Sequence, residues 1–99
     1  MANYLALIQF TEAGLTNIKD SPKRADAFRA EVEAAGGRVR EVFWTLGRFD
    51  GAVIFEARDE PSATALLLAL SQKGFVRTET LRAFETEEFS AVLKQLRGR

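Results

Sequence analysis

The chain of 99 residues has the length of one domain, residues 1–99, and its 46% hydrophobic content excludes a disordered protein. Lys and Arg total 14 and Asp and Glu total 14, so no net charge attracts nucleic acid or an anionic membrane. The lack of Cys and His excludes disulfides, Cys-His zinc sites and His-containing catalytic triads within this chain. We therefore expect no metal, no cofactor and no nucleic-acid partner.

The first half of the chain predicts a strand and a helix. Tyr4–Phe10 is almost wholly apolar, as in a strand buried on both faces. A polar connector follows at 11–20, and Ser21-Pro22 then predicts a helix start with Ser21 as the N-cap. Gly36-Gly37 predicts the helix end, with one glycine in the left-handed conformation. Four apolar side chains recur between them at helical spacing: Ala25, Phe28, Val32 and Ala35.

A hairpin occupies the middle of the chain. Arg38–Leu46 and Ala52–Ala57 predict two strands, and the turn at Gly47–Gly51 is too short for a crossover, so the strands are antiparallel. Regular alternation divides the side chains of the first of these strands into two sets, Arg40, Val42, Trp44 and Leu46 on one face and Val39, Glu41, Phe43 and Thr45 on the other.

The second half repeats the helix and strand and adds a last helix. Asp59–Ser62 predicts a helix start whose acidic residues suit the helix dipole, and Gly74 predicts its end. The core stripe of this helix is Ala63, Leu66, Leu67 and Leu70. Phe75–Phe84 predicts the fourth strand, and Thr86–Glu88 caps a C-terminal helix before a frayed end at Gly98-Arg99. The apolar face of that helix is Phe89, Val92, Leu93 and Leu96.

The order βαββαβ plus a C-terminal helix predicts an α+β fold of the ferredoxin-like type, with a four-stranded antiparallel sheet and both central helices on one face. The first and third strands are apolar on both faces, so the open face of the sheet would carry a large apolar patch. We predict that a second copy covers this face in a homodimer or higher homo-oligomer. The alternative is that the C-terminal helix folds back over it.

The run Phe43–Gly51 resembles the signature of the GYD family, named for a Gly–aromatic–Asp core. Further matches are Thr11-x-x-Gly14, Ile18–Ala25, Glu56-Ala57-x-Asp59 and Val76–Phe84. Phe49 replaces the usual Tyr, which removes a hydroxyl that could donate a proton, and Arg58 stands where Pro is common. The resemblance implies a ferredoxin-like domain of the dimeric α/β-barrel type and no particular activity.

A weaker similarity links Gly74–Thr78 to the effector-binding domains of Lrp/AsnC-type regulators, which bind small molecules at interfaces between subunits. This chain has no helix-turn-helix, so the similarity does not imply DNA binding.

The absence of a signal peptide, and of any apolar run near 20 residues long, predicts a cytoplasmic protein without a membrane partner.

Six residues are candidates for a ligand site: Arg24, Trp44, Arg48, Asp50, Glu56 and Arg77. Arg24 follows Lys23 in the first turn of a helix, where cations oppose the dipole. Two explanations are open for these cations: a carboxylate or phosphate ligand, or pairing with Asp20, Asp26 or a partner subunit. Trp44 either packs in the core or an interface or stacks on a ligand.

The other four candidates also have two explanations each. Asp50 either caps backbone donors of the turn or lines a pocket together with Arg48. Arg77 is either a solvated edge residue or part of an anion or interface site. Glu56 follows an apolar run, so it is the best candidate for a carboxylate base if buried; a strand-end position in solvent is the alternative.

These features leave distinct functions open. The first is a homo-oligomeric small-molecule-binding or assembly domain that takes a small anionic or aromatic ligand. The second is a cofactor-independent enzyme, monooxygenase- or isomerase-like, of the dimeric α/β-barrel class that the resemblance implies. The third is a structural partner protein without a small ligand.

Overall fold

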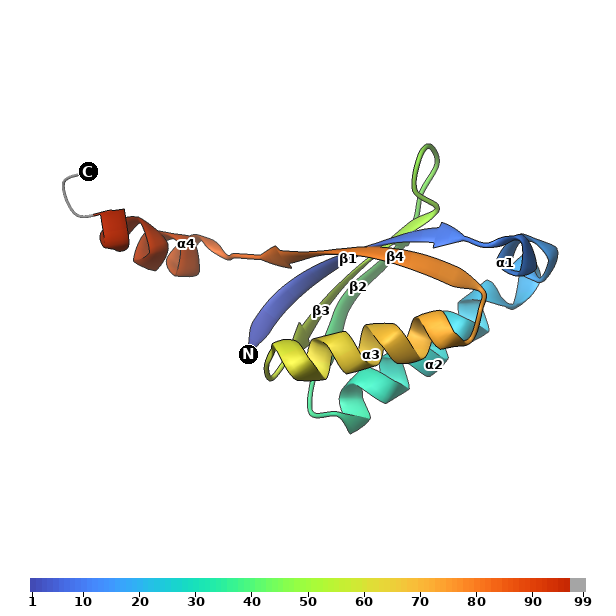
Figure 1. Ribbon diagram of the computed structural model, residues 1–99, viewed down its shortest axis with the longest axis horizontal. Helices are drawn as coiled ribbons and strands as arrows, with labels where there is room; N and C mark the ends of the chain where they lie inside the picture. The colour runs from blue at the N-terminus through green and yellow to red at the C-terminus, as the bar shows by residue number, and fades with distance from the viewer. Residues whose placement is uncertain (97–99) are drawn as a thin grey trace.

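The computed structural model describes residues 1–96, so the expected frayed end at Gly98-Arg99 lies outside the described residues. The elements follow one another along the chain as shown in Figure 1. They are β1 (Ala2–Phe10), α1 (Glu12–Thr16), the 3₁₀ turn η1 (Ile18–Asp20), α2 (Ser21–Ala34), β2 (Arg38–Trp44), β3 (Gly51–Ala57), α3 (Glu60–Gln72), β4 (Val76–Ala83), α4 (Thr86–Leu93) and the 3₁₀ turn η2 (Lys94–Leu96).

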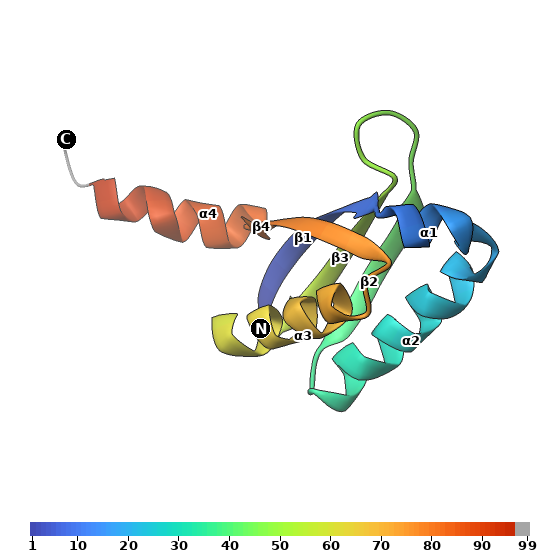
Figure 2. The ribbon, with the colours of Figure 1, turned by 45° about the vertical axis from the view of Figure 1, so that its right-hand side comes forward.

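The four strands form one antiparallel sheet in the order β2-β3-β1-β4. Helices α2 and α3 cover one face of this sheet (Figures 1 and 2). The prediction of a ferredoxin-like α+β fold with an added C-terminal helix is confirmed. β1 and β3 are the two central strands, and their apolar side chains divide between the core on the helix side and the uncovered face of the sheet.

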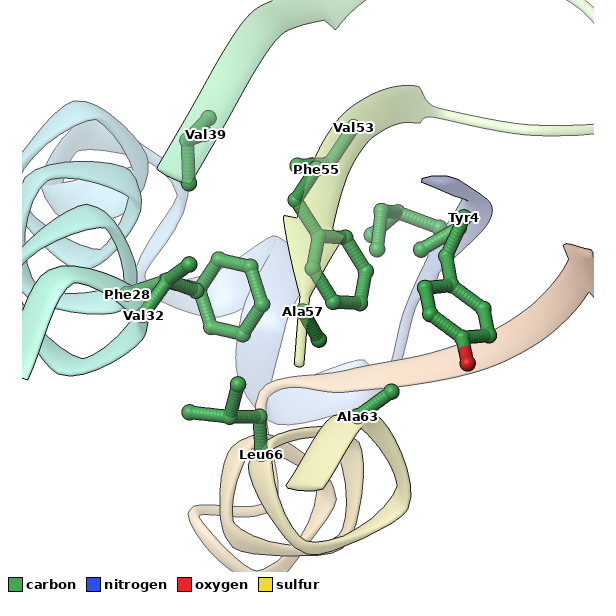
Figure 3. Packing of buried hydrophobic residues seen from close by; sticks show 11 residues of the cluster. Tyr4, Phe28, Val32, Val39, Val53, Phe55, Ala57, Ala63 and Leu66 are labelled. Carbon is green, nitrogen blue, oxygen red and sulfur yellow. The ribbon is translucent and has the colours of Figure 1, made fainter. Parts of the chain in front are cut away.

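The core lies between the sheet and the two helices (Figure 3). Phe55 of β3 and Val32 of α2 are fully buried at its centre. The Phe55 ring stacks on Tyr4 at 5.5 Å between centroids and meets the edge of Phe28 at 5.7 Å. Phe28, Val32, Ala63 and Leu66 confirm the predicted stripes of both helices.

The predicted connector at 11–20 is only partly a connector, because it contains α1 and the 3₁₀ turn η1. The Thr11 hydroxyl accepts the backbone N–H of Gly14 at 3.1 Å and so caps α1. That hydroxyl also donates to the carbonyl of Gly74 at 2.6 Å. A Thr-x-x-Gly cap of this kind is a local signal for a short helix. The helix itself is too short for hydrophobic periodicity to indicate it.

The prediction of Ser21 as the N-cap of α2 is wrong. The helix begins at Ser21 itself, and Asp20, the last residue of the preceding 3₁₀ turn, holds the N-cap position without a side-chain cap bond. The Ser21 hydroxyl is instead the acceptor for the indole N–H of Trp44. A serine before Pro is a strong cap signal, but here the hydroxyl bonds to a residue that is distant in sequence.

The regular alternation predicted along β2 is also wrong, because a β-bulge interrupts the strand between Val39 and Glu41. Val39 pairs with Phe55 and Val42 pairs with Val53, so both valines face the helices. Arg40 is the extra residue, and its side chain reaches the open face. A bulge inserts one residue into the strand, so every side chain after it lies on the opposite face of the sheet from the one that strict alternation would give.

The predicted end of this strand also differs. β2 ends at Trp44, so Leu46 lies in the loop, where it is fully exposed.

The C-terminal helix does not fold back over the open face, so that alternative is wrong. α4 continues from the end of β4 and projects away from the body of the domain (Figures 1 and 2). The side chain of Glu88 accepts the backbone N–H of Glu85 at 3.1 Å and fixes the start of the helix. The predicted apolar face of this helix is exposed: Phe89, Val92 and Leu93 of α4 and Leu96 of η2 have exposed fractions between 42% and 54%.

Candidate functional site

A cleft of about 100 Å³ lies at the hairpin end of the sheet, between its helix-covered face and α2. Its lining combines apolar side chains from every layer of the core with a few polar groups. The residues that line it are Ile8, Phe10, Ser21, Arg24, Ala25, Ala27, Phe28, Val42, Phe43, Trp44, Asp50, Gly51, Val53, Leu70, Lys73, Phe75 and Val76. Three of the six predicted site residues line it, namely Arg24, Trp44 and Asp50.

Trp44 forms one wall of the cleft at the end of β2. Its indole N–H donates to the Ser21 hydroxyl at 2.9 Å, which links the edge strand to the first residue of α2. The Ser21 residue is buried, while 51% of Trp44 stays exposed. The indole is therefore anchored on one side and open on the other, as a stacking surface for a ligand requires.

Arg24 reaches the cleft from the start of α2. One guanidinium nitrogen, Nη1, donates to the carbonyl of Asn17 at 3.0 Å, and the guanidinium carbon lies 4.5 Å above the ring of Phe75. The other nitrogen, Nη2, is buried and has no hydrogen-bond partner among residues 1–96. Within that same part of the chain Arg24 forms no ion pair, so the expected alternative of pairing with Asp20 or Asp26 is not observed.

Asp50 holds the hairpin loop against β1. Its carboxylate Oδ2 accepts the backbone N–H of Phe10 at 2.8 Å, and its own backbone N–H donates to the carbonyl of Ile8 at 2.8 Å. Its carbonyl accepts the backbone N–H of Thr45 at 2.9 Å and closes the loop. The carboxylate therefore satisfies a backbone donor beside the turn, as the turn interpretation predicted, and it also lines the cleft.

The other three candidates lie outside the cleft. Arg48 is exposed in the loop, where its guanidinium carbon lies 5.4 Å from the ring centre of Phe49. Glu56 lies on the open face of the sheet in an ion pair with Arg38 at 2.7 Å. Arg77 is exposed and pairs in register with Gln9 on that same face. Glu56 is thus on the far side of the sheet from the cleft, so it cannot serve as a base there.

The open face of the sheet has an apolar centre between polar ends. The strand registers give one cross-sheet row of Glu41, Ile54, Leu5 and Leu81, and a second of Phe43, Ala52, Leu7 and Glu79. Phe43 is 52% exposed and Leu81 45% exposed, one on each edge strand. No helix among residues 1–96 covers these rows (Figures 1 and 2). The predicted open apolar face is present.

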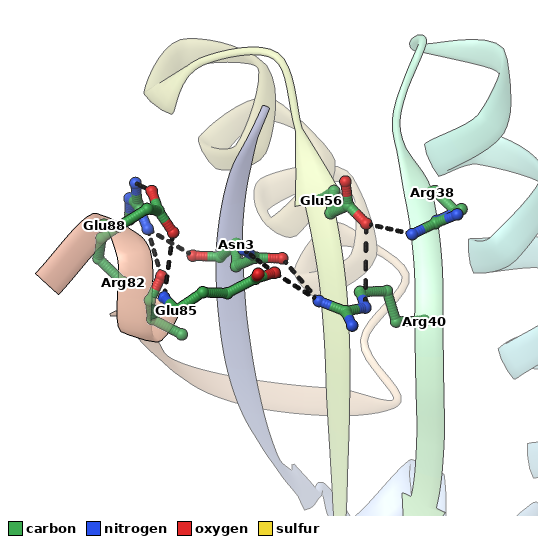
Figure 4. Close-up of polar contacts among 8 residues, drawn as sticks. Asn3, Arg38, Arg40, Glu56, Arg82, Glu85 and Glu88 are labelled. Carbon is green, nitrogen blue, oxygen red and sulfur yellow. Dashed lines mark hydrogen bonds and ion pairs between the residues drawn. The ribbon is translucent and has the colours of Figure 1, made fainter. Parts of the chain in front are cut away.

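A polar network borders this apolar centre where α4 leaves the sheet (Figure 4). Arg40 donates to the Glu85 carboxylate at 2.9 Å and lies 3.9 Å from that of Glu56. The amide of buried Asn3 donates to the same Glu85 oxygen at 3.1 Å. The network joins both edges of the sheet to the N-terminal end of α4.

A second pair in this network fixes the first turn of α4. Arg82 donates to Glu88 at 2.9 Å, and this hydrogen bond holds the pKa of the Glu88 carboxyl below its ordinary value of 4.5. A further contribution in the same direction comes from the backbone N–H of Glu85.

Sequence reasoning missed several residues of these sites. The sequence predicted Ser21 only as a cap and Phe75 only as a strand residue, yet they hold Trp44 and Arg24 in place. Asn3 was not a candidate, although a polar residue just before an apolar strand was the signal that could have marked it. Within residues 1–96, no group of His, Cys, Asp and Glu side chains could hold a metal ion, and no helix is long and apolar enough to cross a membrane.

The strand order and the two helices on one face of the sheet define a ferredoxin-like α+β domain. The GYD domain model matches residues 4–93, and the chain belongs to the GYD domain family. This confirms the resemblance seen in the hairpin sequence.

One relative and one solved structure extend the comparison. A protein of Thermus thermophilus named glutamine synthetase and cystathionine beta-lyase binding protein is 30% identical over 95 residues, which are 95% of this chain and 100% of the relative. A crystal structure of a protein from Thermus thermophilus matches with a TM-score of 0.54 at 24% identity, covering 87% of this chain and 96% of that one. The second comparison supports the fold alone.

Proposed function

We propose that this chain is a homo-oligomeric assembly module that binds other proteins, and that a second copy of the chain occupies the open face of its sheet. The observation that carries the proposal is the apolar centre of that face. Leu5, Leu7, Ile54, Leu81 and Phe43 lie there side by side in the cross-sheet rows. Each large apolar side chain left in water forgoes about 1.5–3 kcal/mol of burial free energy, so a partner surface is favoured.

The charges around the apolar centre suit a second copy. The β2 edge carries Arg38 and Glu41, and the β4 edge carries Arg77 and Glu79. Each edge therefore presents both signs, so two copies related by a two-fold axis can place unlike charges opposite one another. The formal net charge of +0 adds no long-range repulsion between copies.

The exposed helix α4 adds to the surface that assembly would bury. Its apolar face is exposed, and the ion pairs at Glu85 and Glu88 hold its N-terminal end at the sheet. A helix that projects from one copy can contact another copy without any change in the core. The closed barrel expected of the dimeric α/β-barrel type requires the same face-to-face contact between sheets.

The relative from Thermus thermophilus supports protein binding as the role of the module. Its name describes binding to glutamine synthetase and to cystathionine beta-lyase. The identity of 30% extends over 95% of this chain, so the whole domain is shared. We propose that this chain likewise binds enzymes of these two kinds.

Size-exclusion chromatography with light scattering tests the self-association. The wild-type chain is expected to elute at twice the monomer mass of 11.0 kDa, or at a higher multiple. Leu81→Glu places a carboxylate in the apolar row and is expected to give a monomer. The matched control is Leu68→Glu on α3, where the leucine is 60% exposed on the helix side. A monomeric wild type, or equal dissociation by both variants, would contradict the proposal.

Binding of partner enzymes is tested with purified proteins. Immobilised wild-type chain is expected to retain glutamine synthetase and cystathionine beta-lyase saturably at physiological salt, while an unrelated enzyme of similar charge is not retained. Failure to retain either enzyme would overturn the second half of the proposal and leave the self-association to be judged by light scattering.

A further inference from the structure

We infer that the cleft beside α2 is a binding site for a small carboxylic acid with a compact apolar body, and that Arg24 receives the carboxylate. The cleft lies on the helix-covered side of the sheet and shares only Phe43 with the assembly surface, so the inference does not rest on the proposed function. Three observations carry it: an unsatisfied donor, an apolar cavity of suitable size and a fixed aromatic wall.

The unsatisfied donor is Nη2 of Arg24. An arginine stays protonated in proteins, so its N–H groups remain donors whatever the surroundings. Nη1 already bonds to Asn17, and Phe75 fixes the plane of the guanidinium. Nη2 is buried without a partner among the described residues. A buried, charged donor without an acceptor is unfavourable, and a carboxylate is the acceptor that suits a guanidinium best.

The cavity selects the rest of the ligand. Most of its lining is aliphatic or aromatic, with Ile8, Phe28, Val42 and Val53 among the walls. Its volume of about 100 Å³ is of the same order as the engineered apolar cavity of about 150 Å³ that holds benzene, and the cleft opens to solvent beside Trp44, so a single ring can bind without being wholly enclosed. The ligand body is therefore a single small ring or a short branched chain, which excludes nucleotides and long-chain fatty acids.

The aromatic wall orients that body. The indole of Trp44 is held by its hydrogen bond to Ser21, so the side chain loses little rotamer freedom when a ligand packs against it.

A second cation, Lys73, also lines the cleft, but its ammonium is paired with Glu31 at 2.7 Å. Among the cations of the lining, Arg24 is thus the one with a buried donor that has no partner in the described part of the chain, whereas Lys73 is paired and exposed to solvent.

The experiment uses Trp44 as its own reporter, because it is the single tryptophan of the chain. Cyclohexanecarboxylate and 3-methylbutanoate are titrated into the full-length protein, and tryptophan fluorescence and thermal midpoint are followed. Both acids are expected to change the emission saturably and to raise the midpoint. Cyclohexanecarboxamide, which has the same body without the charge, and acetate, which lacks the body, are each expected to bind at least ten-fold more weakly.

Variants separate the site from general acid binding. Arg24→Gln is expected to weaken cyclohexanecarboxylate at least ten-fold, and Arg24→Lys to recover part of the loss. The matched control is Arg77→Gln, which removes an exposed arginine on the open face and is expected to leave the affinity unchanged. Circular dichroism establishes that each variant is folded.

The inference is overturned if neither acid gives a saturable response, if the amide binds as well as the acid, or if Arg77→Gln weakens binding as much as Arg24→Gln. Leu81→Glu is titrated in parallel and is expected to bind the acid as the wild type does. A failure of assembly and a failure of this site are therefore told apart.

Discussion

The carboxylate of Asp50 accepts the backbone N–H of Phe10 at 2.8 Å, so a loop side chain takes the place of a neighbouring strand at the end of β1. The backbone N–H of Asp50 donates to the carbonyl of Ile8, which lies two residues earlier on the same strand. Together the two bonds extend the pairing of β1 with β3 beyond Gly51, where the register ends. The loop is thereby fixed at the rim of the cleft.

Asp50→Ala removes the acceptor and leaves the N–H of Phe10 without its partner. The free energy of unfolding, measured by urea denaturation, is expected to fall by about 1–2 kcal/mol, as for a partly buried donor that loses a charged acceptor. Asp50→Asn keeps an oxygen acceptor and is expected to lose less. Asp26→Ala on the exposed side of α2 is the control and is expected to change stability by less than about 0.5 kcal/mol. Equal losses in Asp26→Ala and Asp50→Ala would show that this bond contributes nothing specific.

Much of this fold was predictable because its signals are local and periodic. Gly36 has a φ of +84°, as the predicted helix end requires, and Gly47 has a φ of +107° in the predicted turn. The two-sided apolar pattern of β1 and β3 matches their central positions in the sheet. Periodicity reports which side chains are buried together, and it does so well for elements longer than two turns.

The site was less predictable, because it depends on contacts between distant segments. Arg24 meets Phe75 and the carbonyl of Asn17, and neither contact leaves a pattern in the sequence near Arg24. The bulge at Arg40 is a second example: it turns Val39 toward the core, and no glycine or proline beside it signals the interruption. Tertiary packing determines both the contacts of Arg24 and the bulge, so composition and residue spacing alone could not predict them.

The bond between Trp44 and Ser21 gives a prediction about the edge strand. Ser21→Ala leaves the indole N–H without its acceptor, and the free energy of unfolding is expected to fall by about 1 kcal/mol. The emission of Trp44 is also expected to change, because the indole loses the contact that holds it against α2. Fluorescence-monitored denaturation measures both. The matched control is Ser90→Ala on the exposed side of α4; an unchanged emission in Ser21→Ala would contradict the anchoring role.

Gly14 gives a prediction about close packing of α1. A Cβ at this position would overlap the carbonyl oxygen of Phe75 and would lie 3.3 Å from Cβ of Phe10. The backbone oxygen cannot move away cheaply, because it also accepts the N–H of Thr11 at 3.0 Å. Gly14→Ala is therefore expected to lower the free energy of unfolding by about 2 kcal/mol or more.

Thermal and urea denaturation measure this effect. Glu12→Ala on the exposed side of the same helix serves as the control and is expected to cost no more than about 0.5 kcal/mol. If Gly14→Ala were as stable as Glu12→Ala, the close approach of α1 to Phe75 would not exist in solution.

Tyr4 gives a prediction about pH. Its ring is buried against Phe55, and its hydroxyl is buried without a hydrogen-bond partner within residues 1–96. Burial raises the pKa of the Tyr4 phenol above its ordinary value of 10.0, and the nearby Glu60 carboxylate adds to the effect. The folded state thus holds the proton more tightly than the unfolded state does. Stability from this group is complete below pH 10.0 and is lost as pH rises through the folded pKa.

Tyr4→Phe removes both the unsatisfied hydroxyl and the titrating proton. At neutral pH the variant is expected to be more stable than the wild type by about 1 kcal/mol, because the phenylalanine ring keeps the packing without a buried polar group. Above pH 10.0 the gap is expected to widen, because only the wild type is destabilised by phenol ionisation in the unfolded chain. Urea denaturation of both proteins across this pH range measures the gap, and lysine titration affects both equally. A variant less stable than the wild type at neutral pH would mean that the hydroxyl has a partner in solution, and a constant gap would mean that the phenol pKa is not raised.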